Sequence, residues 1–338
     1  MKAVITLAPG GLENLKLVDL PDPGKPGCGE IRVAIHATSL NFHDLLVARG
    51  LQPVADQRIM MADGAGIVED VGEDVTEFKI GDNVVSTFFP QWSDGLASGQ
   101  VSNFSQTPGD GAQGFAVEYV VRPVHHFTLA PEGWSHAEAA TITTSGLTAW
   151  RALTGDANLK AGDTILTLGT GGVSVTALQI AKSMGAKLII TSSSDEKLAR
   201  AKALGADYVI NYRSEPEWGK AVQRVTNRKG ADVVIEVGGP GTMAQSINAV
   251  RAGGHIALIG VLTGHEGVIS TSKLMTKQAR IQGLIVGNRR QQQDFVSALN
   301  QTGIRPIISN TYNSLAELAD AFHHQQSGTH FGKITVEW

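Results

Sequence analysis

Cysteine is almost absent from this sequence, since Cys28 is the only one among 338 residues. A disulfide within the chain is therefore impossible, and so is a zinc site built from several cysteines. Long apolar runs are missing too, because no stretch approaches the roughly 18 residues that cross a bilayer. The first residues also lack the apolar core of a secretory signal. We therefore expect a cytoplasmic protein with no membrane partner.

Neither sign of charge predominates. Lys and Arg number 28 and Asp and Glu 32, which gives a formal net charge of −4. Nucleic acid is therefore not an expected partner. Hydrophobic residues make up 42% and charged residues 18% of the chain, which is typical of a folded globular protein and not of a disordered one. At about 150 residues per domain, the length predicts two domains.

The chain changes character near residue 161. Before it, short β-branched runs broken by Gly, Pro and Asp predict a strand-rich region. After it, buried-type strands alternate with helical patterns, which predicts βαβ units and a doubly wound parallel sheet whose ligand lies beyond the carboxyl ends of the strands. The expected strands of this sheet are 164–168, 187–191, 208–210, 232–237 and 255–261, and the expected helices are 173–184, 195–204, 216–226 and 242–251.

Residues 88–115 form a long segment rich in Gly, Ser, Gln and Asn. Segments of this length without regular structure are usually functional. We expect a surface lobe in which Phe88, Phe89 and Trp92 line an apolar pocket. Beyond residue 287, the sequence predicts a helix at 292–299, a strand near 307, a helix at 315–323 and a strand at 333–337.

A glycine-rich turn follows the expected strand 164–168 and comprises Gly169, Thr170, Gly171, Gly172 and Val173. The first glycine permits a tight turn, and Gly171 lets the backbone approach a pyrophosphate lying on the helix N-terminus. Dinucleotide sites usually carry a third glycine where this chain has Ser174, which is small enough to keep the helix close to the strand. In this context the turn predicts a dinucleotide site.

The end of the second strand distinguishes NAD from NADP. An NAD site places an acid there, about 20 residues after the glycines, to bind the ribose 2′-hydroxyl. This chain instead has Thr191, Ser192, Ser193 and Ser194, with Lys197 one turn into the helix. Hydroxyls and a cation suit a 2′-phosphate, which a carboxylate would repel. The stretch favours NADP(H), although Ser194 and the acids after it also form an ordinary helix N-terminus.

The chain carries further motifs at residues 39–44 (SLNFHD), 63–69 (DGAGIVE), 81–84 (GDNV), 116–120 (AVEYV), 146–150 (GLTAW) and 330–333 (HFGK). In combination, and over nearly the whole chain, they resemble the medium-chain dehydrogenase/reductase superfamily and its zinc-free, quinone oxidoreductase-like branch. The resemblance implies an α/β fold. A β-rich, GroES-like catalytic domain would comprise residues 1–125 and 289–338, and a Rossmann dinucleotide-binding domain residues 126–288.

Zinc members of that superfamily hold their catalytic metal with Cys, His and Cys. By the resemblance, the first position falls on Asn41, the second on Ala62 and the third within residues 141–144, which contain no Cys. The segment 88–115 also lacks the four cysteines of their structural zinc. We therefore expect no metal, and hence no Lewis acid to polarise an alcohol.

The resemblance also implies the site residues. It places Asn41 beside the nicotinamide ribose and the substrate, supported by Asp44, with Thr148 facing the nicotinamide. Asn41 can equally be interpreted as the cap of a helix at 42–48, and Thr148 as a packing residue. NADPH members pair a Lys with a Tyr fifteen residues later, a spacing that Lys197 and Tyr212 share. The remaining implied cofactor contacts are Gly260, Val261, Val286, Asn288 and Lys333, the last of these near the pyrophosphate.

These expectations converge on NADP(H)-dependent transfer of hydride to a quinone or an α,β-unsaturated carbonyl. Such acceptors need orientation and hydrogen bonds rather than a metal. Two alternatives stay open: a zinc-independent alcohol or aldehyde oxidoreductase, and a non-catalytic NADPH-binding protein. No proton donor is identified. His43 is the best candidate, because histidine is the side chain that ordinarily exchanges a proton near neutral pH. The alternative interpretation of His43 is an exposed histidine on a helix.

Residues 280–286 read as an apolar strand at the edge of the parallel sheet. An exposed edge needs cover, because its backbone groups can pair with another chain. The superfamily commonly dimerises through such strands, so the resemblance implies a homodimer. The alternative is an edge covered by the chain's own C-terminal helix.

Overall fold

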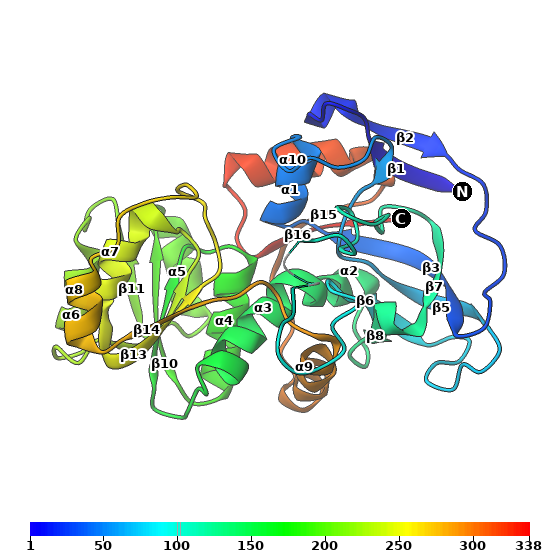
Figure 1. Ribbon diagram of the computed structural model, residues 1–338. Helices are drawn as coiled ribbons and strands as arrows, with labels where there is room; N and C mark the ends of the chain where they lie inside the picture. The colour runs from blue at the N-terminus through cyan, green and yellow to red at the C-terminus, as the bar shows by residue number, and fades with distance from the viewer. Residues whose placement is uncertain (100, 102) are drawn as a thin grey trace. The chain divides into compact units, whose positions relative to one another are not determined.

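The computed structural model describes residues 1–338 except 100 and 102. The chain divides into two units (Figure 1). Unit 1 comprises Met1–Leu147 and Val286–Trp338, and unit 2 comprises Thr148–Ile285. The C-terminal segment therefore rejoins the N-terminal one, although the unit bounds differ from the domain bounds expected from the sequence.

Unit 1 is built on a seven-stranded sheet with the order β15-β16-β3-β5-β6-β8, in which β7 also pairs with β3. Its pairings are antiparallel except that of β15 with β16. A second sheet has the order β2-β1-β4. The strands are β1 (Lys2–Thr6), β2 (Leu15–Asp19), β3 (Glu30–Ser39), β4 (Arg58–Ile59), β5 (Ala65–Val71), β6 (Asn83–Ser86), β7 (Tyr119–Pro123), β8 (Phe127–Leu129), β15 (Ile308–Tyr312) and β16 (Lys333–Glu337).

In the described residues of unit 1, the α-helices that lie wholly within it are α1 (Phe42–Ala48), α2 (His136–Ala140), α9 (Arg289–Thr302) and α10 (Leu318–Ser327). Helix α2 buries its alanines against Ala37 and Ala65 of β3 and β5. Strand β8 pairs with β6. These contacts place residues 126–147 in unit 1, whereas the sequence-based bounds put them in the Rossmann domain. The periodicity of this segment is local and does not show which sheet it packs against.

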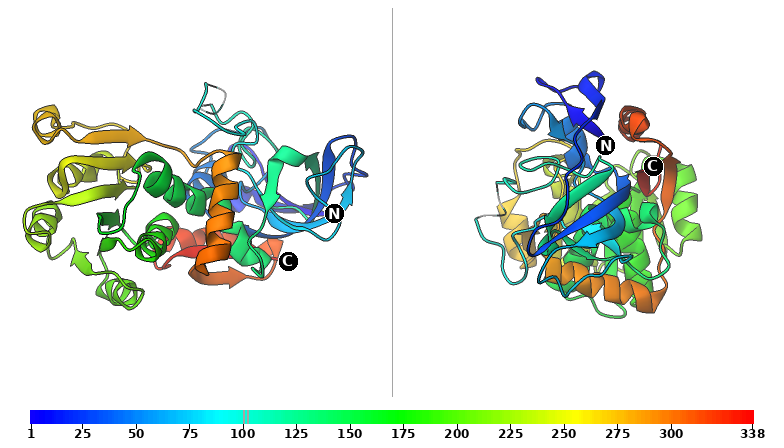
Figure 2. Two further views of the ribbon diagram at one scale, coloured as in Figure 1. Left: turned by 90° about the horizontal axis from the view of Figure 1, so that it is seen from below. Right: turned by 90° about the vertical axis from the view of Figure 1, so that its right-hand side faces the viewer.

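Unit 2 is a six-stranded sheet with the order β11-β10-β9-β12-β13-β14, in which every pairing is parallel. Helices lie on both of its faces (Figures 1 and 2). The strands are β9 (Thr164–Leu168), β10 (Lys187–Ser192), β11 (Tyr208–Asn211), β12 (Ala231–Glu236), β13 (Val250–Leu258) and β14 (Arg280–Gly283). The helices are α4 (Gly172–Ser183), α5 (Asp195–Ala203), α6 (Trp218–Val225), α7 (Pro240–Ala249) and α8 (Thr271–Lys277), while α3 (Leu147–Trp150) contains the boundary between the units.

The strand order of unit 2 reverses beside β9, so the switch point lies between β9 and β12. Ligands of such sheets bind beyond the carboxyl ends of the strands at this point. All six residues of β12 are buried, as expected for a parallel strand covered on both faces. The predicted alternation of strands and helices is confirmed. The predicted bounds of the helix at 242–251 and the strand at 255–261 were wrong, because α7 ends at Ala249 and β13 covers Val250–Leu258.

Only the second half of the segment 114–121 is a strand. In the structure β7 begins at Tyr119, and Phe115 and Ala116 instead donate backbone hydrogen bonds to Met61 and Met60.

Within the described residues, no helix has the length and apolar character needed to cross a membrane. In each unit, the fold places candidate site residues at the ends of strands.

Candidate functional site

The glycine turn of unit 2 is shaped to receive an anion. Gly169 has a φ of +73°, which favours glycine, and a Cβ at Gly169 or Gly171 would meet no atom within 4 Å. Gly171 is the N-cap of α4 and carries no side chain to cap the helix. The start of the 12-residue helix therefore has no side-chain cap, and its dipole favours negative charge there. Thr170, Gly172 and Val173 complete the turn.

Ser174 has a specific role at the position of the missing third glycine. Its hydroxyl donates to the carbonyl oxygen of Leu168 at 2.7 Å, and the residue is buried. The serine thereby ties the first turn of α4 to the last residue of β9. The close packing that glycine usually permits is retained through a hydrogen bond, and the departure from the usual pattern does not argue against a dinucleotide.

The end of β10 collects the residues expected at the ribose 2′ position. Tyr212 donates its backbone N–H to Ser192 O at 3.1 Å, so the chain after β11 lies beside the end of β10. Ser194 caps α5 by accepting from Lys197 N at 3.3 Å, which confirms the ordinary helix start. Burial chiefly lowers the pKa of Lys197, and Arg200 adds to this. The structure therefore brings Ser192, Ser193, Lys197 and Tyr212 to one end of the sheet.

Unit 1 contains a buried polar cluster, which we define as Ser39, Asn41, Asp44, Asp63, Thr144 and Lys333. Each member comes from a different place in the chain: the end of β3, the N-cap of α1, its first turn, the residue pair before β5, the helical segment 142–146 and the start of β16. All but Thr144 are less than 9% exposed. The cluster therefore has to satisfy its own polar groups.

Asp63 lies at the centre of this cluster. Its Oδ2 accepts from Ser39 Oγ at 2.5 Å and from Asn41 Nδ2 at 2.8 Å, and its Oδ1 accepts from Thr144 Oγ1 at 2.6 Å. The sequence prediction named Asn41 but missed Asp63 and its two hydroxyl partners. The available signal was the DGAGIVE motif, which begins with this residue next to the second zinc position.

Lys333 supplies the positive charge of the cluster. Its Nζ donates to Leu40 O at 2.5 Å and to Asn41 Oδ1 at 2.6 Å, and lies 3.8 Å from Asp63 Oδ2. The sequence resemblance implied a position near the cofactor pyrophosphate. The structure instead engages this buried ammonium within unit 1, and a role in cofactor binding stays a prediction.

Asp44 joins the start of α1 to the segment that leads into β5. Its Oδ2 accepts from Asn41 N at 3.1 Å and Asn41 Nδ2 at 3.0 Å, and its Oδ1 accepts from Ala62 N at 2.9 Å. Helix α1 covers residues 42–48 as predicted, with Asn41 as its N-cap. The capping interpretation of Asn41 is therefore confirmed, and its expected place beside the nicotinamide stays a prediction.

The charges of the cluster perturb one another. Burial raises the pKa of Asp63 to about 6; the positive charge of Lys333 opposes the shift, and the negative charge of Asp44 adds to it. Burial likewise raises the pKa of Asp44. Burial lowers the pKa of Lys333, and the two carboxylates counteract this. Burial thus disfavours the charged form of each of the three groups, and the opposite charges of the cluster favour it.

The residues at the three zinc positions do not fit a zinc ion. Asn41 Oδ1 already accepts from the ammonium of Lys333, a cation that would repel a second one. Ala62 has no donor atom, and the hydroxyl of Thr144 donates to Asp63. Zinc needs three or four N, S or O ligands. In the described part of the chain, no three His, Cys, Asp or Glu side chains are arranged to hold a metal.

Aromatic side chains pack against His43 in the first turn of α1. Its ring lies 4.9 Å from that of Phe104 and 5.6 Å from that of Phe88, between centroids, and its Nε2 lies 3.1 Å from Asp110 Oδ2. Phe88, Phe89 and Trp92 are each less than 7% exposed. They pack together inside the 88–115 lobe, and their lining of a substrate pocket stays a prediction. Sequence reasoning did not find Asp110.

Three further predicted positions lie close to the unit boundary in the sequence. Thr148 is buried. Asn288 caps α9 by accepting from Gln291 N at 2.8 Å, and its Nδ2 donates to Gly95 O at 3.2 Å, so its side chain is engaged within unit 1. Val286 has a φ of +48°, a strained conformation for a β-branched residue that costs of order 1–3 kcal/mol. Strain of this kind concentrates at functional sites.

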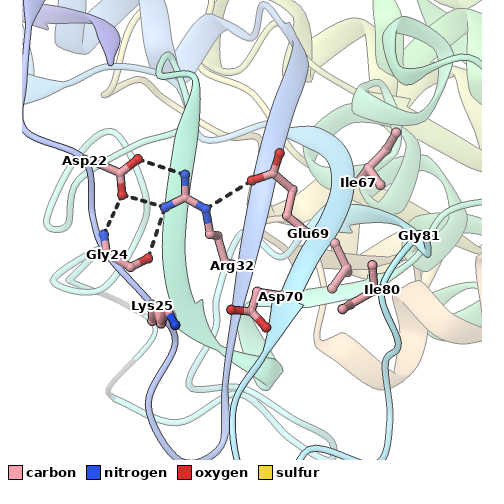
Figure 3. Close-up of a pocket in the computed structure, with 10 residues that line it drawn as sticks. Asp22, Gly24, Lys25, Arg32, Ile67, Glu69, Asp70, Ile80 and Gly81 are labelled. Atoms are coloured by element: carbon pink, nitrogen blue, oxygen red, sulfur yellow. Dashed lines mark hydrogen bonds and ion pairs between the residues drawn. The ribbon is translucent and has the colours of Figure 1, made fainter.

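Unit 1 also has a surface hollow of about 710 Å³, which is lined by residues between 22 and 81 (Figure 3). Arg32 crosses it and donates to both carboxylate oxygens of Asp22, at 2.7 and 2.9 Å, and to Glu69 at 3.0 Å. No predicted site residue lines it. Because the guanidinium is already paired with these two acids, the hollow offers no evident reactive group.

The fold and the glycine turn together define an oxidoreductase that uses a nicotinamide dinucleotide. Residues 27–132 match the alcohol dehydrogenase GroES-like domain, and residues 172–301 match the zinc-binding dehydrogenase family. The chain is 37% identical to a zinc-type alcohol dehydrogenase-like protein of Schizosaccharomyces pombe, over 97% of this chain and 96% of that protein. It belongs to the medium-chain dehydrogenase/reductase superfamily.

Relatives within this superfamily carry different activities in their names. A solved NAD-dependent alcohol dehydrogenase is 33% identical with a TM-score of 0.89, over 100% of both chains. The quinone oxidoreductase of Pseudomonas syringae pv. tomato DC3000 is 29% identical with a TM-score of 0.83, over 100% of this chain and 99% of that one. Acryloyl-coenzyme A reductase of Sulfurisphaera tokodaii is 27% identical over the full length of both proteins.

Replacing Lys333 with Met should destabilise unit 1, because Asp63 and Asn41 would lose a buried partner. Removing one member of a buried ion pair costs about 3–5 kcal/mol. Urea unfolding of the purified variant measures this loss. Lys2→Met, which removes an exposed pair with Asp19, is the matched control and should unfold as the wild type does. Equal stability of Lys333→Met and the wild type would contradict a central role for the ammonium.

Proposed function

We propose that this protein transfers hydride from NADPH to a quinone or an α,β-unsaturated carbonyl without zinc. The observation that carries the proposal is the donor set of the buried polar cluster, in which the ammonium of Lys333 meets Asn41 at 2.6 Å. A site of this kind supplies no Lewis acid to form an alkoxide, whereas an electron-poor acceptor needs none. The quinone oxidoreductase and acryloyl-coenzyme A reductase relatives support the same substrate class.

NADPH supplies the hydride when bound. The protein's own part is orientation and hydrogen bonding, and the cluster suits it because its groups are fixed before any substrate arrives. Phe88, Phe89 and Phe104 pack against one another beside His43. His43, which is 19% exposed and near Asp110, is the group we assign as proton donor to the reduced acceptor.

Replacing His43 with Asn tests this assignment. The rate of turnover should fall, whereas the affinity for NADPH should not change.

NADPH is favoured over NADH by the end of β10. No acid follows Thr191 until Asp195, and the side chain of Asp195 accepts from Asn211 Nδ2 at 2.7 Å. Ser192, Lys197 and Tyr212 supply hydroxyls and a cation at the same end of the sheet, which suits a 2′-phosphate. The NAD-dependent relative shows that the superfamily also uses the other cofactor, so a direct comparison of the two is needed.

A homodimer is the assembly that unit 2 favours. Strand β14 is at the edge of the parallel sheet, and its Arg280, Gln282 and Gly283 are exposed. Large apolar side chains are exposed in the same unit, namely Leu262, Val268, Ile269, Met275 and Ile285. A second copy paired along β14 would satisfy the open backbone edge and could cover part of this apolar surface.

The activity is tested with NADPH and a panel of quinones, enones and primary alcohols, monitored by the reduced-nicotinamide absorbance. We expect turnover of quinones or enones that is insensitive to EDTA, and metal analysis should find far less than one zinc per chain. Zinc-dependent or EDTA-sensitive alcohol oxidation as the sole activity would contradict the proposal. Cofactor binding without turnover of any acceptor would instead support a non-catalytic role.

Replacing Lys197 with Ala should weaken NADPH binding by about tenfold or more, while NADH binding changes little, because a charge-assisted contact to phosphate contributes about 1.5–3 kcal/mol. Fluorescence titration with each cofactor measures the two affinities. Lys202→Ala is the control, since Lys202 lies on the same helix but donates to Asp207 O. Equal losses for both cofactors would refute the 2′-phosphate assignment.

Light scattering should give about twice the 35.7 kDa of one chain. Introducing charge with Val268→Asp and Met275→Asp should weaken the dimer, because both side chains are more than 70% exposed in unit 2. Leu96→Asp places the same charge at an exposed apolar residue of unit 1 and should leave the mass unchanged. A monomeric wild-type protein at micromolar concentration would contradict this assembly.

A further inference from the structure

A fully buried carboxylate lies at the end of β12, and no predicted site residue accounts for it. Glu236 is 0% exposed and is the last residue of the strand. Its Oε1 accepts from Gly238 N at 2.7 Å, Gly239 N at 2.9 Å and Thr242 Oγ1 at 2.6 Å. Its Oε2 accepts from Ser246 Oγ. All four donors are neutral groups.

The four bonds explain why an acid is tolerated here. Burying a carboxylate is costly unless hydrogen bonds replace its water, and an ionised carboxylate is an acceptor with no donor of its own. Gly239 is the N-cap of α7 and has no side chain to cap the helix. Glu236 instead accepts from the N–H of Gly239 and from that of Gly238 before it, while Gly241 in the first turn of α7 donates its N–H to Thr263 Oγ1 at 2.8 Å. The N-terminal end of the helix dipole also favours the charge of Glu236. Its side chain determines the shape of the turn from Val237 to Pro240.

A second turn, after β13, rests on the first one. Ile259 and Gly260 donate their backbone N–H groups to Glu236 O at 2.8 and 3.2 Å. Thr263 donates to Gly238 O through its backbone N–H at 2.8 Å and through its hydroxyl at 2.7 Å. The approach is so close that a Cβ at Gly260 would lie 2.2 Å from Val237 O. The position of residues 259–263 therefore depends on that of residues 236–238.

We propose that Glu236 is a positioning residue for the nicotinamide half of the cofactor. It holds the turn after β12, and this turn holds Gly260 and Val261, while the adenine half binds the separate turns after β9 and β10. The proposal rests on the proposed function for one point, the assignment of Gly260 and Val261 to the cofactor. Its structural part, the dependence of the second turn on Glu236, is independent of any ligand.

Two substitutions at Glu236 separate geometry from charge. Glu236→Ala removes the acceptor and leaves Gly238 and Gly239 with unsatisfied N–H groups. Glu236→Gln keeps a carbonyl oxygen for the three donors at Oε1, and its amide can donate to the Ser246 hydroxyl, so it should restore the turn. Asp232→Asn is the matched control, because Asp232 is a buried acid at the opposite end of the same strand and pairs with Arg251.

The first measurement compares the binding of NADPH with that of adenosine 2′,5′-bisphosphate, which contains only the adenine half. Glu236→Ala should weaken NADPH by about tenfold and the fragment by less than about twofold. Glu236→Gln should bind both as the wild type does, and Asp232→Asn should lower the melting temperature without separating the two ligands. If Glu236→Ala does not fold, Thr242→Val removes one donor and should produce the same selective loss in smaller measure.

The second measurement is amide hydrogen exchange of the ligand-free proteins. Glu236→Ala, or Thr242→Val in its place, should speed exchange in residues 238–242 and 259–264, and Asp232→Asn should not. Unchanged exchange at 259–264 would overturn the proposal even if no cofactor bound. Equal losses of NADPH and the fragment would overturn it as well. Failure of the wild type to bind either nicotinamide cofactor would instead count against the proposed function and leave exchange as the deciding result.

Discussion

The ammonium of Lys333 and the carboxylate of Asp63 are the pair on which unit 1 depends. A buried ammonium must find acceptors, and those of Lys333 are Leu40 and Asn41, 293 and 292 positions away in the chain. This requirement draws the start of β16 to the end of β3. The carboxylate of Asp63 lies 3.8 Å from the same ammonium and also accepts a hydrogen bond from the hydroxyl of Thr144. Four distant segments therefore meet around one buried ammonium.

The same physical rule operates at the strand ends of unit 2. Ser174 bonds the carbonyl at the end of β9, and Glu236 bonds the N–H groups after β12. In both cases a buried side chain satisfies a backbone group that the turn leaves open. The turns around the switch point are consequently rigid where polar side chains support them and open where glycine leaves space for a ligand.

The donor set of the buried polar cluster does not suit a metal ion. A metal centre needs several ligands with electron pairs available, whereas the side-chain carbonyl oxygen of Asn41 already accepts a hydrogen bond from the ammonium of Lys333. The raised pKa of Asp63, about 6, shows how far burial has moved the carboxylate from its ordinary behaviour. A cation held by the protein itself has a fixed position, so it can orient groups but cannot exchange ligands as a metal does.

Local patterns determined much of this protein from the sequence alone. Alternating apolar runs identified strands β9 to β13 of unit 2 and its helices α4 to α7, although not α8. The glycine turn and the cap at Asn41 followed from short motifs whose partners lie close in the chain, and the family resemblance paired Lys197 with Tyr212. The tertiary structure alone decided which sheet residues 126–147 join and which groups surround Asn41. It also paired His43 with Asp110 and gave Glu236 its four donors. Periodicity reports which face of an element is buried, whereas the partners of a buried charge depend on how distant segments fold together.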